Sequence, residues 1–310
     1  MNNELPDYAS LPFVSVVIPV YNDSERLERC LKTLQNQTYS QELYEVIVVD
    51  NGSDLEIDTI VSGYTQAVLS VETNPGSYAA RNKGISVSKG KIIAFTDSDC
   101  IPVSDWIEKG VLKLESLPEY GFVAGKIKMF FKNPKKLSAV EIYENIRSFN
   151  QKKNIEKYQH GVTANLFTYK KVLEHAGCFS ETLKSGGDVE WGKRVHALGY
   201  KIYFADEVCV FHPARHTFGE LYKKTTRVVG GIYDWKGKRN PYSIKLLLFD
   251  LIKILRFVLS IAISFNRKSS FSRNLVGTRH KIQYIRVVVF VGLAKIFEKT
   301  RLQLGGNSRR

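Results

Sequence analysis

Residues 91–99 read KIIAFTDSD, an apolar run that ends in two aspartates one position apart. Two further apolar runs, Val14 to Ile18 and Val46 to Val49, come earlier in the chain. Between them, apolar residues recur at i, i+3, i+4 and i+7 from Leu27, the spacing of an amphipathic helix. Uninterrupted apolar strands separated by helices are typical of a parallel sheet covered on both faces. The first hundred residues therefore predict an α/β fold.

The pattern after residue 110 is mixed rather than strictly alternating. It predicts strands at 121–131 and 163–169, helices at 136–150 and 188–198, and two short strands at 201–205 and 208–211. Such a mixture fits a second half that is built onto the edge of the first sheet.

Acidic turns follow two of the apolar runs, at Asp50 and at Asp97 with Asp99. Ligands of an open parallel sheet collect at the carboxyl ends of its strands. Asp97 and Asp99 would be costly as unpaired buried charges, so they favour a bound cation. Carboxylate oxygens suit Mg²⁺ or Mn²⁺, which bind through one or two carboxylates together with substrate phosphates.

The chain lacks both GxGxxG and GxxxxGK[ST], which disfavours dinucleotide cofactors and P-loop hydrolysis. Arg81 stands near the start of a helix predicted at 76–88, where a cation and backbone donors can hold a pyrophosphate. A solvated helix residue is the alternative interpretation of Arg81.

Together these residues resemble glycosyltransferase family 2, whose catalytic domain has the GT-A fold. The order and spacing of the motifs match over roughly residues 13–231. The matching motifs, in chain order, are Val16 to Asn22, Val48 to Ser53, Ala80 to Gly84, Ala94 to Asp99, Asn165 with Lys171 to Phe179, Gly187 to Trp191, Arg194, Gly199 to Ile202, and Val210 to His212.

The resemblance implies a role for each matching residue at the donor site. Pro19, Tyr21 and Asp50 would hold the nucleotide base. Arg81 would hold the base or the pyrophosphate, Asp97 the ribose, and Asp99 the metal that bridges the two phosphates.

The resemblance also implies a general base and a third metal ligand. Asp188 falls on the aspartate of the family's Glu-Asp motif, but the preceding residue here is Gly187, and Glu190 follows two positions later. Asp188 is therefore the expected base and Glu190 the alternative. His212 matches a histidine that completes the metal site in many relatives, and a structural or acceptor-facing histidine is the alternative.

The implied reaction is an inverting transfer of a single sugar from a nucleotide-sugar, expected to be UDP-linked, to a hydroxyl of a lipid-linked or growing glycan. Processive members carry QxxRW after the base, and this chain does not. Residues 1–110 would form the nucleotide-sugar-binding half, and 111–231 the half that binds the acceptor and carries the base. A non-catalytic scaffold of the same fold in envelope polysaccharide assembly is one alternative.

The net positive charge of the chain comes from its C-terminal end. The net charge of +14 divides into −2 through Phe218 and +16 from Gly219 onward. Within the tail, 232–310, the polar residues of the segment from Ser243 to Ser264 fall within an arc of about 160° on a helix, with apolar residues filling most of the rest. We expect this basic, helical tail to associate with an anionic membrane surface. Packing of these helices on the catalytic body is the alternative.

The location follows from the cysteines and the N-terminus. The four cysteines show no zinc or CxxC spacing, and Met1 to Pro12 is polar and acidic rather than a secretory signal. We therefore expect a cytoplasmic protein, peripheral on the inner face of the cell membrane, with free cysteines buried as small apolar residues. A nucleic-acid-binding protein with a basic tail is a further alternative, but the tail's apolar residues are not interleaved stacking aromatics, so no nucleic acid is expected.

Overall fold

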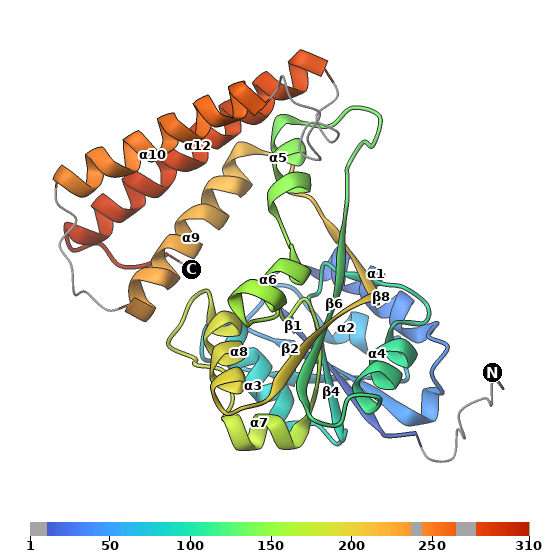
Figure 1. Ribbon diagram of the computed structural model, residues 1–310. Helices are drawn as coiled ribbons and strands as arrows, with labels where there is room; N and C mark the ends of the chain where they lie inside the picture. The colour runs from blue at the N-terminus through green and yellow to red at the C-terminus, as the bar shows by residue number, and fades with distance from the viewer. Residues whose placement is uncertain (1–10, 237–243, 265–276, 310) are drawn as a thin grey trace, which may run out of the picture. The chain divides into compact units, whose positions relative to one another are not determined.

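The chain alternates strands and helices in its first half and ends in long helices (Figure 1). The computed structural model describes residues 11–236, 244–264 and 277–309. In chain order the elements are β1 Val14–Val20, α1 Ser24–Gln35, the 3₁₀ turn η2 Gln41–Leu43, β2 Tyr44–Asp50, α2 Asp58–Val61, β3 Ala67–Val71, α3 Ser77–Val87, β4 Ile92–Thr96, β5 Ile101–Pro102, α4 Trp106–Glu115, β6 Tyr120–Phe130, α5 Ala139–Arg147, α6 Gln151–Tyr158, β7 Asn165–Tyr169, α7 Lys170–Ala176, α8 Gly187–Ala197, β8 Lys201–Pro213, α9 Phe218–Lys236, α10 Ile244–Ser264 and α12 Gly277–Gln303.

One mixed sheet of eight strands carries the fold, in the order β3-β2-β1-β4-β7-β6-β8-β5. The pairs β1–β2, β1–β4 and β2–β3 are parallel, whereas β7 runs antiparallel to β4 and to β6. The predicted α/β fold with a parallel sheet is confirmed in the first half, and the mixed pattern after residue 110 corresponds to the antiparallel strands.

The central strands are buried along most of their length. All of β4 and β7 is buried, as are all but one residue of β1 and of β2. Helix α3 packs on β1 and β2, and Gly84 allows the close approach, since a Cβ there would lie 2.4 Å from a methyl group of Val17. The apolar runs of the sequence are therefore strands that bury side chains on both faces.

The second half corrects the sequence analysis at one strand. Two short strands were expected at 201–205 and 208–211, but β8 is continuous from Lys201 to Pro213. Asp206 and Glu207, the two residues between the expected strands, lie exposed within β8 and form ion pairs with Lys126 and Lys113. Successive side chains of a strand point to opposite faces, and each of these carboxylates reaches a lysine without interrupting the strand.

The chain divides into two compact units. The first contains Met1–Lys128, Asn150–Glu181 and Gly187–His212, and the second contains Met129–Phe149, Thr182–Gly186 and Pro213–Arg310. Strands β6 and β8 continue from the first unit into the second. The functional division into 1–110, 111–231 and 232–310 remains a prediction.

In the second unit, α12 packs on α5, α9 and α10. Tyr284 and Val287 of α12 are fully buried, in clusters with Ile142 and Val140 of α5. Among the helices that the structure describes, none is both long enough and apolar enough to cross a bilayer. The polar arc predicted between Ser243 and Ser264 falls partly outside the described residues, because Ser243 is not among them.

Cysteine burial follows the expectation at three of the four positions. Cys30, Cys100 and Cys209 are buried as free thiols, but Cys178 is exposed. The general preference of free cysteine for the interior does not hold at Cys178, which follows the C-terminal end of α7.

Candidate functional site

The acidic residues predicted for the site stand at the carboxyl ends of neighbouring parallel strands. Asp50 ends β2 and is in register with Val20, the last residue of β1. Strand β4 lies on the other side of β1 and ends at Thr96, directly before Asp97. The ends of three adjacent strands thus form one edge of the sheet, the position at which open α/β sheets bind their ligands.

Asp97, Asp99 and His212 bring ligand atoms together within 4.8 Å of one another. The Nε2 of His212 lies 3.4 Å from Oδ1 of Asp99, and the histidine is only 4% exposed. Burial raises the pKa of Asp99, and the carboxylate of Asp97 acts in the same direction while His212 opposes it. Two carboxylates and an imidazole form a donor set that suits Mn²⁺ or Mg²⁺.

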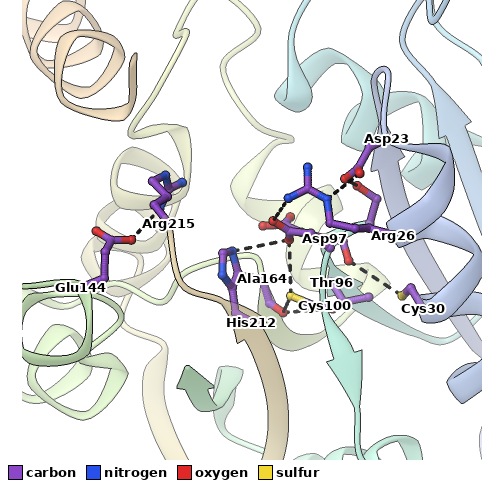
Figure 2. A network of polar contacts seen from close by, with 12 residues as sticks. Asp23, Arg26, Cys30, Thr96, Asp97, Cys100, Glu144, Ala164, His212 and Arg215 are labelled. Carbon is purple, nitrogen blue, oxygen red and sulfur yellow. Dashed lines mark hydrogen bonds and ion pairs between the residues drawn. The ribbon is translucent and has the colours of Figure 1, made fainter. Parts of the chain in front are cut away.

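The sequence analysis missed two charged residues beside this cluster, both near the start of α1 (Figure 2). Arg26 approaches Asp99 to 3.8 Å and donates from Nε to Asp23 at 2.6 Å. Ser98 donates to the other oxygen of Asp23 at 2.9 Å. These contacts connect α1 to the acidic turn, and no local pattern in the sequence pointed to them.

Arg81 is buried, which contradicts its interpretation as a solvated helix residue. Its side chain is 5% exposed, and its Nη2 donates to Oδ1 of Asp97 at 2.5 Å. A second donor, Nη1, reaches the carbonyl of Ser77 at 3.2 Å, while Nε has no hydrogen-bond partner among the described residues. A buried donor without a partner costs about 1–3 kcal/mol, so this guanidinium favours an incoming anion.

Asp188 is the second residue of α8 and contacts α3 through the phenol of Tyr78. The Tyr78 hydroxyl donates to Oδ1 of Asp188 at 3.1 Å, and the backbone N–H of Val189 donates to the same oxygen at 3.0 Å. No described residue hydrogen-bonds to Oδ2. Burial raises the pKa of Asp188, although the Arg81 and His160 side chains and the Tyr78 hydrogen bond act against the rise. Sequence reasoning assigned no role to Tyr78 or His160.

The ring of Tyr78 also explains the glycine before Asp188. A Cβ at Gly187 would lie 2.8 Å from the ring, closer than real Cβ contacts. The ring is held in turn by Phe179, with centroids 5.8 Å apart, and by Arg81, whose guanidinium carbon lies 5.6 Å from the ring centre. The space that a glutamate side chain would need at residue 187 is therefore occupied by Tyr78.

Glu190, the alternative base, is already engaged with Arg194. Its two oxygens accept from Nε and Nη2 of Arg194 at 3.0 and 2.9 Å. The same guanidinium donates to the carbonyl groups of Ala176, Gly177 and Cys178 at the end of α7. Glu190 and Arg194 together fasten α8 to the end of α7.

The residues predicted to hold the nucleotide base lie at the ends of β1 and β2. Pro19 belongs to β1, Tyr21 follows it with 51% of its surface exposed, and Asp50 accepts a hydrogen bond from the N–H of Ser53 at 3.0 Å. Asn51 was missed: it is buried, accepts from the N–H of Gly76 at 2.7 Å, and so fixes the turn that precedes α3.

The sequence of this chain is similar to known glycosyltransferases. Residues 15–175 match the family model described as glycosyl transferase family 2. The chain is 37% identical over 301 residues to glycosyltransferase AglE of Haloferax volcanii, an alignment that covers 94% of this chain and 95% of the relative. It is 26% identical over 265 residues to an uncharacterized glycosyltransferase of Methanocaldococcus jannaschii, covering 80% of this chain and 90% of that one.

The fold is similar to that of a solved enzyme, the mannosyltransferase PcManGT from Pyrobaculum calidifontis in complex with GDP-Man and Mn²⁺. The superposition has a TM-score of 0.61 and covers 94% of this chain and 89% of that structure, at 17% sequence identity. At that identity the likeness shows the GT-A fold.

Proposed function

Because the chain belongs to glycosyltransferase family 2, we propose that it moves one sugar from a nucleotide donor to a hydroxyl of a lipid-linked or growing glycan, with inversion of the anomeric carbon. One observation carries the proposal: the cluster of Asp97, Asp99 and His212 is joined through Arg81 and Tyr78 to a second, separate carboxylate, Asp188. The metal cluster and Arg81 would stabilise negative charge on the leaving group, and Asp188 would act as the base for the acceptor hydroxyl.

We assign the base to Asp188. Its Oδ1 is held by two donors, which fixes the orientation of the carboxylate and leaves Oδ2 open to accept the proton of the acceptor hydroxyl. A pKa above that of an ordinary aspartate makes it a stronger base, and catalysis by a base improves as its pKa approaches the working pH. Both oxygens of Glu190 are bound to Arg194, so that carboxylate serves the packing of α8.

The donor's diphosphate would approach Arg81, whose buried Nε has no partner among the residues described. Pro19, Tyr21 and Asp50 would contact the nucleotide base, and Asp97 the ribose. We propose UDP as the nucleotide, following the resemblance of the motifs. GDP-mannose is the donor in the solved mannosyltransferase, so it belongs in the same test.

Asp99 and His212, with Asp97 beside them, would hold Mn²⁺ or Mg²⁺. The bound ion would neutralise negative charge on the departing nucleoside diphosphate. Arg81 supplies the same kind of stabilisation from the protein itself, through a guanidinium that is fixed before the donor arrives.

A panel of nucleotide-sugars, scored by thermal shift with Mn²⁺ or with EDTA, tests this proposal. A ligand at 100 times its Kd stabilises the native state by about 2.7 kcal/mol, which is easily measured. We expect one class of UDP- or GDP-sugar to raise the Tm in Mn²⁺ and to lose most of that effect in EDTA. A non-catalytic scaffold would show no stabilisation by any donor and no transfer.

We further propose that the C-terminal helices hold the protein on the cytoplasmic face of an anionic membrane, where a lipid-linked acceptor resides. One face of α10 carries a row of apolar side chains that are 39–59% exposed. Single exposed apolar residues are common on protein surfaces, but a continuous row of them marks an interaction surface. The row consists of Leu248, Leu251, Ile252, Leu255 and Leu259. A helix with this face lies in the interface without crossing it.

Truncation of the tail is a poor test, because Tyr284 and Val287 of α12 are part of the buried core of the second unit. The double substitution Leu251→Gln with Leu255→Gln changes only exposed side chains. It should release the protein from anionic vesicles, and high salt should weaken but not abolish attachment of the parent chain. Leu198→Gln, at an exposed leucine of the first unit, is the matched control. Binding to DNA or RNA in place of vesicles would contradict the assignment.

A further inference from the structure

Helices α10 and α12 pack apolar side chains and an ion pair between them, and both also carry apolar side chains on exposed faces. Asp250 of α10 forms an ion pair with Lys299 of α12 at 2.5 Å, while Leu255 of α10 and Phe297 of α12 are 59% and 57% exposed. An amphipathic helix pair in water normally buries its apolar faces against each other. Here further apolar side chains stay exposed beyond those that pack between the helices, which indicates an apolar environment on the outside.

A cavity of about 480 Å³ lies between α5, α10 and α12, in the second unit, and both apolar and charged side chains line it. Four cations and one carboxylate line it: Arg147, Lys253, Lys295, Lys299 and Asp250. Its volume lies within the range of small-molecule sites, about 300–1,000 Å³. A concave site with this excess of positive charge suits a compact anion.

The cations of the cavity are not all neutralised by the chain. Asp250 is paired with Lys299, and among the described residues Lys295 forms no ion pair with a carboxylate. Lys295 is exposed at the rim of the cavity; partial desolvation lowers its pKa, the neighbouring cations Lys299 and Arg147 lower it further, and Asp250 acts in the opposite direction. A bound anion would stabilise the charged ammonium of Lys295 and remove this repulsion.

The shape of the cavity is set by packing rather than by chance contact of two surface helices. A Cβ at Gly292 of α12 would lie 2.5 Å from Ile254 of α10, so the absence of a side chain at this glycine allows the two helices to pack closely. On the α5 side, the guanidinium of Arg147 lies 4.5 Å from the ring centre of Phe257 and donates to the hydroxyl of Tyr284 at 2.9 Å. The cationic groups are therefore held by apolar and aromatic partners.

We propose that this cavity binds the phosphate headgroup of an anionic lipid, with Lys295 as its principal contact. The phosphate fits the cations inside, and the acyl chains fit the apolar faces outside, which a free phosphate would leave uncovered. The inference deepens the proposed membrane association by naming a headgroup site, and it does not depend on the transfer reaction.

A short-chain lipid in solution tests the cavity apart from the membrane. The probe is dihexanoyl phosphatidic acid at concentrations where it is monomeric, titrated into the full-length protein by calorimetry, with pyrophosphate as the second ligand. Lys295→Gln should weaken lipid binding by about tenfold, the scale of losing one charge-assisted hydrogen bond. Arg286→Gln removes one exposed cation from the same helix outside the cavity and should change the affinity less than twofold, about the precision of such a titration.

Saturable lipid binding that Lys295→Gln weakens and Arg286→Gln preserves supports the site. Absence of binding, or equal loss in both variants at unchanged Tm, overturns it. Pyrophosphate binding as tightly as the lipid would refute the lipid as the ligand, because the apolar faces would then contribute nothing. Failure of vesicle attachment with intact short-chain binding would reject the membrane proposal and leave the headgroup site standing.

Discussion

Replacing Asp188 by asparagine separates chemistry from binding at the proposed site. Asparagine keeps the size of the side chain and an oxygen that can accept from Tyr78 and Val189, but it cannot take a proton at pH 7. We expect kcat to fall by about 10²–10⁴-fold, the contribution typical of a general base. The affinity for the donor should stay near that of the parent, because the hydrogen bonds of Asp188 go to Tyr78 and Val189 rather than to the Asp97–Asp99 cluster, and Asp188 acts on the acceptor.

The pH dependence of the parent enzyme provides an independent measure of the same group. A general base must be deprotonated, so kcat/KM should rise with pH through the pKa of Asp188 and level off above it. Burial raises that pKa above the 3.8 of an ordinary aspartate, so the midpoint of the rise should lie above 3.8. In Asp188→Asn the residual activity should lose this limb.

Glu190→Gln is the matched control, two residues along the same helix. It removes the charge from a bidentate pair whose side chains are 22% and 31% exposed, a loss of about 1 kcal/mol. That corresponds to a Tm lower by about 2–4 °C, and kcat should stay within a factor of a few. The assay is steady-state transfer with a donor identified by the panel. If Glu190→Gln loses activity by two orders of magnitude and Asp188→Asn does not, the assignment of the base is refuted.

Three further substitutions test neighbouring parts of the structure. Asp99→Asn should weaken nucleoside diphosphate binding strongly in Mn²⁺ and little in EDTA, and equal affinity of variant and parent in Mn²⁺ would exclude Asp99 as a metal ligand. Tyr78→Phe removes a donor that favours the charged carboxylate, so it should move the acidic limb of kcat/KM to higher pH; a limb at the same or lower pH would argue against Asp188 as its origin. Glu144→Gln should destabilise the protein by about 3–5 kcal/mol at pH 7 in urea unfolding, because Glu144 is fully buried and pairs at 2.9 Å with Lys224 and with Arg215; Figure 2 shows the pair with Arg215. Burial alone would raise the pKa of Glu144, but Lys224 and Arg215 hold it below 4.5. The parent should therefore lose the stability that the ion pairs contribute as the pH falls through this lowered pKa. The free energy of unfolding of the variant should not show this decrease.

The first half of the fold was predictable because its signals are local. Strands β1, β2 and β4 are buried on both faces, so each had to be an uninterrupted apolar run. The position of Asp97 and Asp99 followed from the same pattern, since residues directly after a parallel strand lie at its carboxyl end. Their partner His212 came only through the resemblance of the motifs, because it arrives from β8, more than a hundred residues away.

The contacts that distinguish the two candidate bases were not predictable from local pattern. Tyr78 and Asp188 are separated by 110 residues, and an aromatic residue in a helix carries no signal that its hydroxyl will reach a distant carboxylate. For the same reason Arg26 was missed, and the residues between the two short strands predicted at 201–205 and 208–211 proved to belong to the continuous strand β8. The segment of α10 was correctly predicted to be a helix, but the sequence does not reveal that its Asp250 pairs with Lys299 of α12.

The contact between Gly187 and Tyr78 constrains the order in which substitutions can accumulate at this site. Gly187→Glu as a first step places a side chain against the ring, 2.8 Å away. Loss of the ring as a first step removes the hydroxyl that holds Asp188. A chain with a tyrosine at 78 and a chain with a glutamate at 187 are thus separated by a pair of changes in which each single change is unfavourable. A glutamate at residue 187 would therefore require a change at Tyr78 as well.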